Sequence, residues 1–248
     1  MKKTIFKIIA VVLLAALLFS TVGFIVWAND AYPPSPIALN ALKTDALVKV
    51  ELVSGVYMFI PVKAVPTVGF IFYPGGRVDY RSYAPVLRSI AENGYLVALV
   101  HAPLNLAFFD LKAAFPVIAQ HPEIKKWVVS GHSLGGVAAS VFAKDHLDTL
   151  DGLVFFASYP ADESLKNAGI KVLSIYGTRD MAGMAKFDET RVLNPANTKY
   201  VVIQGGNHAQ FGSYGVQARD NTPEISAEEQ WAQTVTATVE FLKDIERQ

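Results

Sequence analysis

The chain of 248 residues is long enough for one large α/β domain or two small ones. It carries 22 basic and 22 acidic side chains, so its net charge gives no reason to expect a nucleic-acid partner. It has no cysteine, which excludes disulfides, thiolate metal sites, a cysteine nucleophile and a lipidated cysteine anchor, and which fits an exported protein.

The N-terminal segment is apolar enough to interact with a membrane. Residues 8–27 contain no charged side chain, and three lysines precede them. An apolar run of about 20 residues can span a bilayer, and the basic flank would keep the N-terminus in the cytoplasm. The alternative is a signal peptide that is cleaved after Ala28, which would leave a secreted protein. Both interpretations export the domain, and the length of the run favours a single-pass membrane anchor.

The rest of the chain divides into a short linker and one domain. Residues 29–45 include three prolines and predict an extended linker. No internal repeat, low-complexity tract or second domain boundary follows residue 40. We therefore expect an anchor or signal peptide over residues 1–28, then the linker, and a single domain over residues 46–248.

Apolar strands alternate with helical segments along this domain. A hairpin is expected over residues 48–60, where two strands flank Ser54 and Gly55. Further strands are expected over residues 68–73, 95–100, 127–130, 153–157, 172–176 and 200–203. Helices are expected over residues 83–92, 104–120 (interrupted at Pro116), 135–146 and 226–247. The alternation predicts an α/β fold in which helices cover both faces of a mostly parallel central sheet.

Ser133 lies in a Gly-x-Ser-x-Gly pattern between a predicted strand and a predicted helix. A residue on such a sharp turn has a strained backbone, and Gly131 and Gly135 let the strand and the helix approach closely. The serine Oγ then projects at the carboxyl edge of the sheet, where the helix N-terminus stabilises developing negative charge. In this position the pattern indicates a nucleophile rather than a loop residue.

A serine nucleophile needs a general base, and His208 is the histidine that fits. After such a turn, the acid and then the histidine follow in chain order. The other histidines precede the serine, adjoin it facing away, or come before any suitable acid: His101, His121, His132 and His146. His208 instead follows the last predicted strand, at the edge where such folds place functional groups.

Asp180 is the expected acid, because it follows a predicted strand and a glycine turn between the serine and the histidine. It would hold the imidazole in the productive tautomer and stabilise its protonated form. A helix-capping role is the alternative for this residue. Asp188, which lies within a predicted helix, is the fallback acid.

The oxyanion of an acyl-transfer intermediate needs N–H donors. One is expected from Leu134, the residue after the nucleophile. The other is expected from the loop after the third strand, where residues 73–77 read Tyr-Pro-Gly-Gly-Arg. Glycines let the main chain come close enough to donate, and both Gly76 and Arg77 are candidates.

Five segments of the chain resemble the α/β-hydrolase superfamily. They are YPGGRVDYRSYAP, GYLVALVHAPLNLAFF, HPEIKKWVVSGHSLGG, IYGTRD and GGNHAQFGSYG. More narrowly, residues 46–247 resemble the compact bacterial group of dienelactone-hydrolase-like proteins, with a serine where dienelactone hydrolases proper have a cysteine nucleophile. The resemblance implies an α/β-hydrolase fold with an eight-stranded sheet, no cofactor, and ester hydrolysis through an acyl-enzyme. We also expect no metal site.

Only a short connection separates the strands expected to end at Ala157 and to begin at Lys171, which leaves no room for a large cap domain. A site without a lid should be open and should show no activation by lid opening. Leu104, Phe108 and Tyr214 are candidates for an apolar substrate-binding wall, although residues in such patterns more commonly face a core.

These features predict a serine esterase for short or medium acyl esters, held outside the cytoplasmic membrane. An acyltransferase, a thioesterase or an amidase would use the same triad, because the pocket sets the leaving group and the acceptor. A catalytically silent hydrolase fold that acts as a surface binding module is a further alternative. The intact set of Ser133, Asp180 and His208 disfavours it.

Overall fold

An eight-stranded sheet forms the centre of the computed structural model, which describes residues 2–247. Its strand order is β1-β2-β4-β3-β5-β6-β7-β8. The strands are β1 (Val48–Val53), β2 (Val56–Pro61), β3 (Val68–Tyr73), β4 (Leu96–Leu99), β5 (Lys126–His132), β6 (Gly152–Phe156), β7 (Lys171–Gly177) and β8 (Lys199–Ile203). Strand β2 pairs antiparallel with β1 and β4, and every later pairing is parallel. The predicted hairpin and mostly parallel sheet are confirmed.

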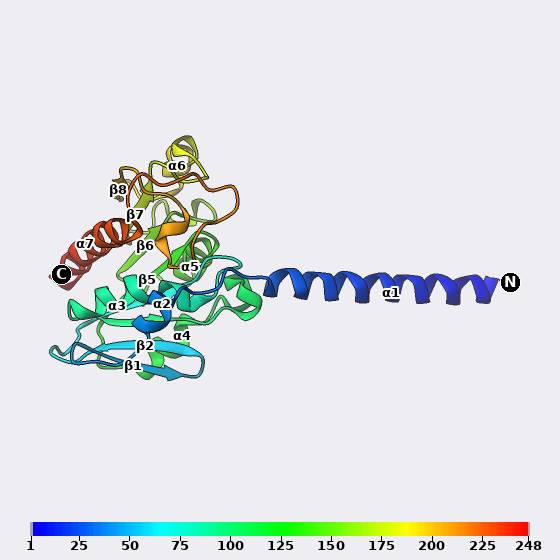
Figure 1. The fold of residues 1–248 in the computed structure, drawn as a ribbon, viewed down its shortest axis with the longest axis horizontal. Coiled ribbons are helices and arrows are strands. Elements are labelled where there is room, and N and C mark those ends of the chain that lie inside the picture. The colour runs from blue at the N-terminus through cyan, green and yellow to red at the C-terminus, as the bar shows by residue number, and fades with distance from the viewer. Residues whose placement is uncertain (1, 248) are drawn as a thin grey trace.

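Helices cover both faces of the sheet (Figure 1). They are α1 (Lys2–Asn29), α2 (Pro36–Ala41), α3 (Ala84–Glu92), α4 (Ala114–Gln120), α5 (Leu134–Lys144), α6 (Met184–Thr190) and α7 (Ala227–Glu246). Buried residues of α3 and α7 share one core cluster, and those of α4 and α5 share the other. Side chains along β3 alternate between the two clusters, since successive residues of a strand point to opposite faces. The sheet is therefore buried on both sides.

Residues 104–120 differ from the expected helix. The structure has two 3₁₀ turns, η2 (Pro103–Asn105) and η3 (Ala107–Asp110), before the short helix α4. Leu104 and Asn105 both have φ of 53°, a left-handed conformation that cannot continue a right-handed helix. Pro116 lies in the first turn of α4, where the missing N–H removes no helical hydrogen bond.

Between β6 and β7 lies only one 3₁₀ turn, η4 (Glu163–Leu165). No large cap domain is inserted at this point of the described chain, as expected. The connection after β6 therefore adds no separate domain over the carboxyl edge of the sheet.

Helix α1 projects away from the domain (Figure 1). Its candidate span, Lys3–Asn29, is long enough to cross a membrane and contains an 18-residue stretch with a mean hydropathy of 2.8. The segment predicted as an extended linker over residues 29–45 instead lies against the domain. Tyr32 forms a parallel bridge with Val78, and Ser35 caps α2, whose Ala38 is buried. Local capping and main-chain pairing thus hold this segment in place.

Candidate active site

Ser133 occupies a sharp turn between β5 and α5. Its backbone has φ of 51° and ψ of −123°, a conformation that residues with a Cβ rarely adopt. A Cβ on Gly131 would overlap the Gly135 backbone, and a Cβ on Gly135 would overlap the carbonyl oxygens of Tyr73 and Pro74. The two glycines of the motif therefore allow the strand, the helix and the preceding loop to meet. Ser158 Oγ donates to Ser133 O at 2.7 Å and helps to fix the turn.

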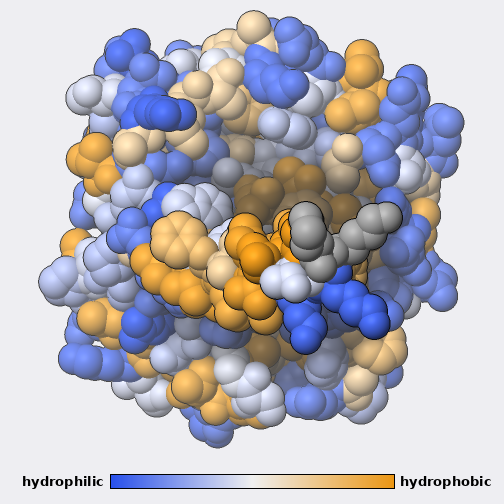
Figure 2. All heavy atoms as spheres, turned by 90° about the vertical axis from the view of Figure 1, so that its right-hand side faces the viewer, coloured by the Kyte–Doolittle hydropathy of each residue, from blue (hydrophilic) through white to orange (hydrophobic). Residues whose placement is uncertain are grey.

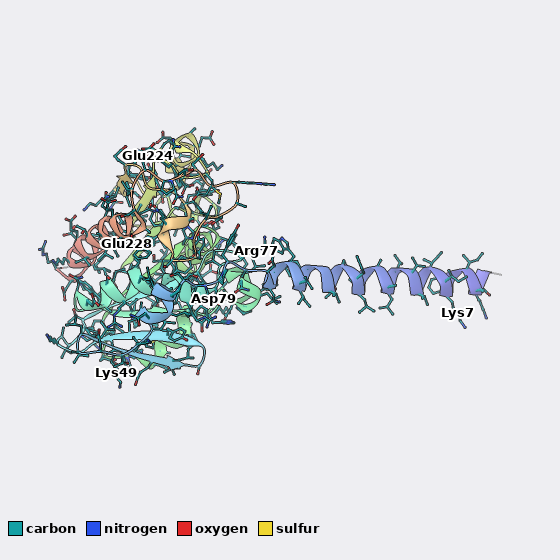
Figure 3. All side chains as sticks on the ribbon, in the orientation of Figure 1. Lys7, Lys49, Arg77, Asp79, Glu224 and Glu228 are labelled. Atoms are coloured by element: carbon teal, nitrogen blue, oxygen red, sulfur yellow. The ribbon has the colours of Figure 1, made fainter. Side chains whose placement is uncertain are left out.

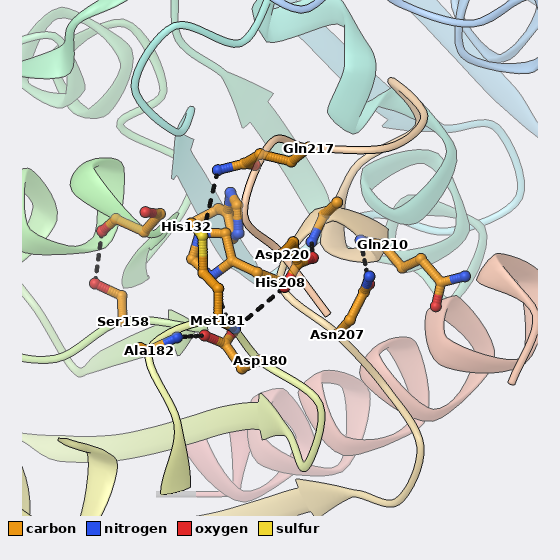
Figure 4. A network of polar contacts seen from close by, with 12 residues as sticks. His132, Ser158, Asp180, Met181, Ala182, Asn207, His208, Gln210, Gln217 and Asp220 are labelled. Atoms are coloured by element: carbon orange, nitrogen blue, oxygen red, sulfur yellow. Dashed lines mark hydrogen bonds and ion pairs between the residues drawn. The ribbon is translucent and has the colours of Figure 1, made fainter. Parts of the chain in front are cut away.

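His208 and Asp180 form a buried pair at the same edge of the sheet. Asp180 follows β7 and His208 follows β8, as predicted. His208 Nδ1 lies 2.9 Å from Asp180 Oδ2, while Asp180 Oδ1 accepts the Ala182 N–H at 2.8 Å (Figure 4). Both carboxylate oxygens are thus occupied, which fixes the carboxylate and the imidazole that it holds. His208 Nε2 makes no hydrogen bond within residues 2–247, to Ser133 or to any other group.

The loop that carries His208 is clamped from α7. Gln230 is fully buried; its Oε1 accepts the Asn207 N–H at 3.0 Å, and its Nε2 donates to Asn207 O at 2.8 Å. Asp220 Oδ2 accepts the N–H of Ala209 at 2.8 Å on the other side of the histidine (Figure 4). Sequence analysis missed Gln230 and Asp220, because nothing in the sequence indicates which distant side chain reaches this loop.

His132 packs directly behind the histidine of this pair. Its ring centroid lies 4.5 Å from that of His208, and its Nδ1 lies 2.8 Å from Tyr83 Oη. Tyr83 Oη also accepts the Gly75 N–H at 3.0 Å. Burial, and then the neighbouring His208, hold the pKa of His132 well below its usual value, so this imidazole is neutral. His132 was predicted to face away from the site; its side chain in fact contacts the His208 ring and, through Tyr83, the Gly75 loop.

The loop after β3 lies against the start of α5. The N–H of Gly75 is taken by Tyr83, and the N–H of Arg77 donates to Asn105 O at 2.8 Å. Gly76 lies between them, and a Cβ built on it would be 2.9 Å from the Leu134 side chain. The Leu134 N–H belongs to the first turn of α5, where amides lack an intrahelical acceptor.

The three residues expected to form a substrate-binding wall lie in different surroundings. Leu104 is half-buried in η2, and Phe108 is exposed on η3. Tyr214 is buried instead, with its ring centroid 5.6 Å from that of Tyr32 and its Oη donating to Gln217 at 2.9 Å. Tyr214 therefore belongs to the core beside the site.

The sheet order and the three strand-end positions define an α/β hydrolase. The sharp turn at Ser133 after β5, Asp180 after β7 and His208 after β8 lie along the carboxyl edge of one sheet. The model of the Alpha/beta hydrolase family matches residues 69–232, and the chain belongs to this family. No curated protein matches the chain.

Solved structures that share the fold include proteins named as hydrolases. A predicted CIB-like hydrolase from Thermoplasma acidophilum is 17% identical with a TM-score of 0.57, over 79% of this chain and 98% of that one. Dienelactone hydrolase from Anabaena variabilis is 18% identical with a TM-score of 0.57, over 77% of this chain and 94% of that one. Est1E from Butyrivibrio proteoclasticus is 14% identical with a TM-score of 0.57, over 82% of this chain and 100% of that one. At these identities the likeness concerns the fold.

Proposed function

We propose that the protein is a serine esterase that cleaves carboxylic esters through an acyl-enzyme on Ser133. The observation that carries the proposal is the strained turn at Ser133 beside the buried Asp180–His208 pair. Strained backbone persists only where the surrounding structure enforces it, and it clusters at functional sites. The family match and the esterase names among the solved structures support the same class of reaction.

In the proposed reaction, Ser133 Oγ attacks the ester carbonyl carbon while His208 Nε2 takes the serine proton. Asp180 holds the Nδ1–H of the histidine and stabilises the imidazolium. The tetrahedral intermediate collapses, the carbon–oxygen bond to the alcohol breaks, and His208 returns the proton to the leaving alkoxide. Water then attacks the acyl-enzyme with the same histidine as base, releasing the acid and free Ser133.

We assign the oxyanion donors to the N–H groups of Leu134 and Gly76. The Arg77 N–H has an acceptor in Asn105 O, and the Gly75 N–H has one in Tyr83 Oη, so the amide between them is the one left to donate. The Leu134 side chain packs against Gly76, and this closeness of the two residues supports the assignment. Leu104 and Phe108 are proposed to line the path of the acyl group.

We also propose that α1 is retained as a single-pass anchor with the domain outside the cytoplasm. Its apolar length and hydropathy fit a membrane span, and the basic residues precede it. The contacts that its last turn makes with the domain support retention over cleavage after Ala28.

The test uses the full chain in detergent beside Ser133→Ala. Each protein is treated with a fluorophosphonate and weighed intact, then assayed with p-nitrophenyl esters of rising chain length, one thioester and one anilide. We expect a single adduct on the parent alone, and a loss of ester turnover of about a thousandfold or more in the variant. A folded parent with no adduct and no turnover would refute the proposal and favour a binding module.

A further inference from the structure

The last turn of α1 is built into the domain. Helix ends leave carbonyl groups without intrahelical partners, and here the domain supplies them. Arg77 Nε donates to Trp27 O at 3.0 Å, and Asn105 Nδ2 donates to Ala28 O at 3.1 Å. Arg77 lies where α1 meets the domain (Figure 3). Its guanidinium lies 4.8 Å from the centroid of the Trp27 ring, and its Nη2 lies 2.9 Å from Asp30 Oδ2. The helix dipole favours a cation such as Arg77 at the C-terminus of α1. Together, these contacts fix the position at which α1 leaves the domain.

This point adjoins the proposed oxyanion site. Arg77 directly follows Gly76, and its N–H bonds to Asn105 O, so the two loops that cap α1 are also bonded to each other. The Leu106 side chain lies 3.6 Å from the position of a Cβ on Gly76, on the side where Leu134 also packs. The same loops therefore hold the anchor and border the catalytic groups.

Exposed aromatic side chains continue this surface toward the anchor. Phe109 is 55% exposed and Phe108 is 43% exposed, both on η3. The Phe109 ring makes an edge contact with the ring of Phe24 in α1, and the two ring centroids are 6.0 Å apart. Phe24 precedes Trp27 by three residues and so lies about 4.5 Å further along the helix toward the apolar span. Figure 2 looks along α1 toward the domain and shows the hydrophobic side chains of the projecting helix in front of a hollow in the surface.

A tryptophan at the end of a membrane span sits at the lipid–water interface. With Trp27 at that level, Phe109 lies at the depth of the acyl chains, and the loops around Gly76 lie just above them. A ring in contact with Phe24 is hidden from water once the helix is inserted, which accounts for two neighbouring exposed phenylalanines on a loop.

We propose that the mouth of the active site faces the bilayer that holds α1, and that the substrate is an amphiphilic ester residing in the outer leaflet. This inference rests on the proposed esterase function and anchor. The ester carbonyl reaches Ser133 from the membrane surface while the acyl chain remains among lipids and beside Phe108. No lid has to move, because the membrane itself covers the approach.

The experiment places the full chain in vesicles of ether-linked phosphatidylcholine, which contains no ester. A fluorogenic ester with two long acyl chains is embedded either in the same vesicles or in separate vesicles mixed with them. Soluble p-nitrophenyl acetate reports the integrity of the catalytic groups. Sharing a membrane raises the effective concentration of the ester, and we expect turnover about tenfold or more faster in the same vesicles than in separate ones.

Phe109→Ser should slow hydrolysis of the embedded ester by about fivefold, because the variant lacks the exposed phenyl ring that inserts among the acyl chains and keeps the mouth at the membrane. Its rate on p-nitrophenyl acetate should stay unchanged. Phe115→Ser is the matched control: this phenylalanine is 56% exposed on α4 and stacks near His146 instead of α1, so it should alter neither rate.

Equal rates in shared and separate vesicles, with p-nitrophenyl acetate still cleaved, would overturn the membrane-facing mouth and leave the esterase standing. Absence of turnover on the soluble ester together with no fluorophosphonate adduct would overturn the esterase, and the inference with it.

Discussion

The backbone of Ser133 is strained, and this strained conformation sets the position of its Oγ. A residue with a Cβ at φ of 51° and ψ of −123° is destabilised by about 1–3 kcal/mol relative to a relaxed conformation. The turn is maintained by the first hydrogen bonds of α5, by Ser158 and by the close fit of Gly131 and Gly135. The strain belongs to the backbone, so it can be measured apart from the chemistry.

Replacing Ser133 by glycine should relieve this strain, while replacing it by alanine should not. We expect the free energy of unfolding of Ser133→Gly to be about 1 kcal/mol higher than that of Ser133→Ala. This difference already includes the larger conformational entropy that glycine loses on folding, which offsets part of the relieved strain. Both variants lack the nucleophile and should be inactive. Urea unfolding of the full chain in one detergent compares them, and identical midpoints would show that the turn is unstrained.

His132 makes the stability of the protein depend on pH. A histidine that is neutral when folded binds a proton more readily when unfolded, so acid favours unfolding. The contribution is complete above the unfolded pKa of about 6.5 and is lost as the pH falls below it, at up to about 1.4 kcal/mol per pH unit. Tyr83 and His208 are the titratable groups that contact the ring.

His132→Asn should flatten this slope between pH 6.5 and 5, because asparagine does not titrate and can still face Tyr83 Oη. The measurement is urea unfolding at several pH values for the parent and the variant, with the difference between their slopes as the readout. Parallel slopes would mean that His132 titrates alike in the folded and unfolded states.

The elements of the fold bring the candidate site residues together through contacts that the sequence predicts to different degrees. The positions of Ser133, Asp180 and His208 at one edge of the sheet could be predicted because each follows a strand, and the ends of parallel strands share an edge. Tyr83 and Gln230 could not, because their partners lie far away in the sequence and depend on how α3 and α7 pack. The prediction of one helix over residues 104–120 was wrong because Leu104 and Asn105 have a left-handed backbone. No feature of the sequence indicates this conformation at two non-glycine residues.

Helix α7 should matter for catalysis although it carries no catalytic residue. Gln230→Met keeps the length of the side chain but leaves the N–H and C=O of Asn207 buried without partners. We expect a loss of stability of about 2–4 kcal/mol and a fall in kcat as the His208 loop loosens. Gln233→Met makes the same chemical change at an exposed position of the same helix, and should be neutral. Equal unfolding midpoints for the two variants would contradict the clamp.

At the scale of the whole molecule, one side of the domain carries both the proposed active site and the link to α1. Sheet order places β3, β4 and β5 side by side, so the loops after β3 and β4 meet the start of α5. The segment after α1 was predicted to be a free linker, and its packing could not be foreseen because Tyr32 and Ser35 pair with distant main-chain groups. The orientation of the domain relative to α1 is thereby set by short-range contacts.

Arg77→Ala should loosen this connection. The substitution removes donors to Trp27 O and Asp30, and we expect limited proteolysis between α1 and the domain to become about tenfold faster as the opened form becomes more populated. Arg219→Ala removes an exposed arginine elsewhere and serves as the control. An unchanged cleavage rate at the junction would show that other contacts suffice to hold the helix end.

The capped end of α1 also has a consequence for biosynthesis. Synthesis begins at the N-terminus, so the helix exists before Arg77 and Asn105 have been translated. Both caps lie on loops after central strands and can form only once those strands have paired. Until the domain has folded, the carbonyl groups of Trp27 and Ala28 therefore have only temporary hydrogen-bond partners. Capture of the helix end is a late event in maturation, and it couples completion of the sheet to final placement of the catalytic edge.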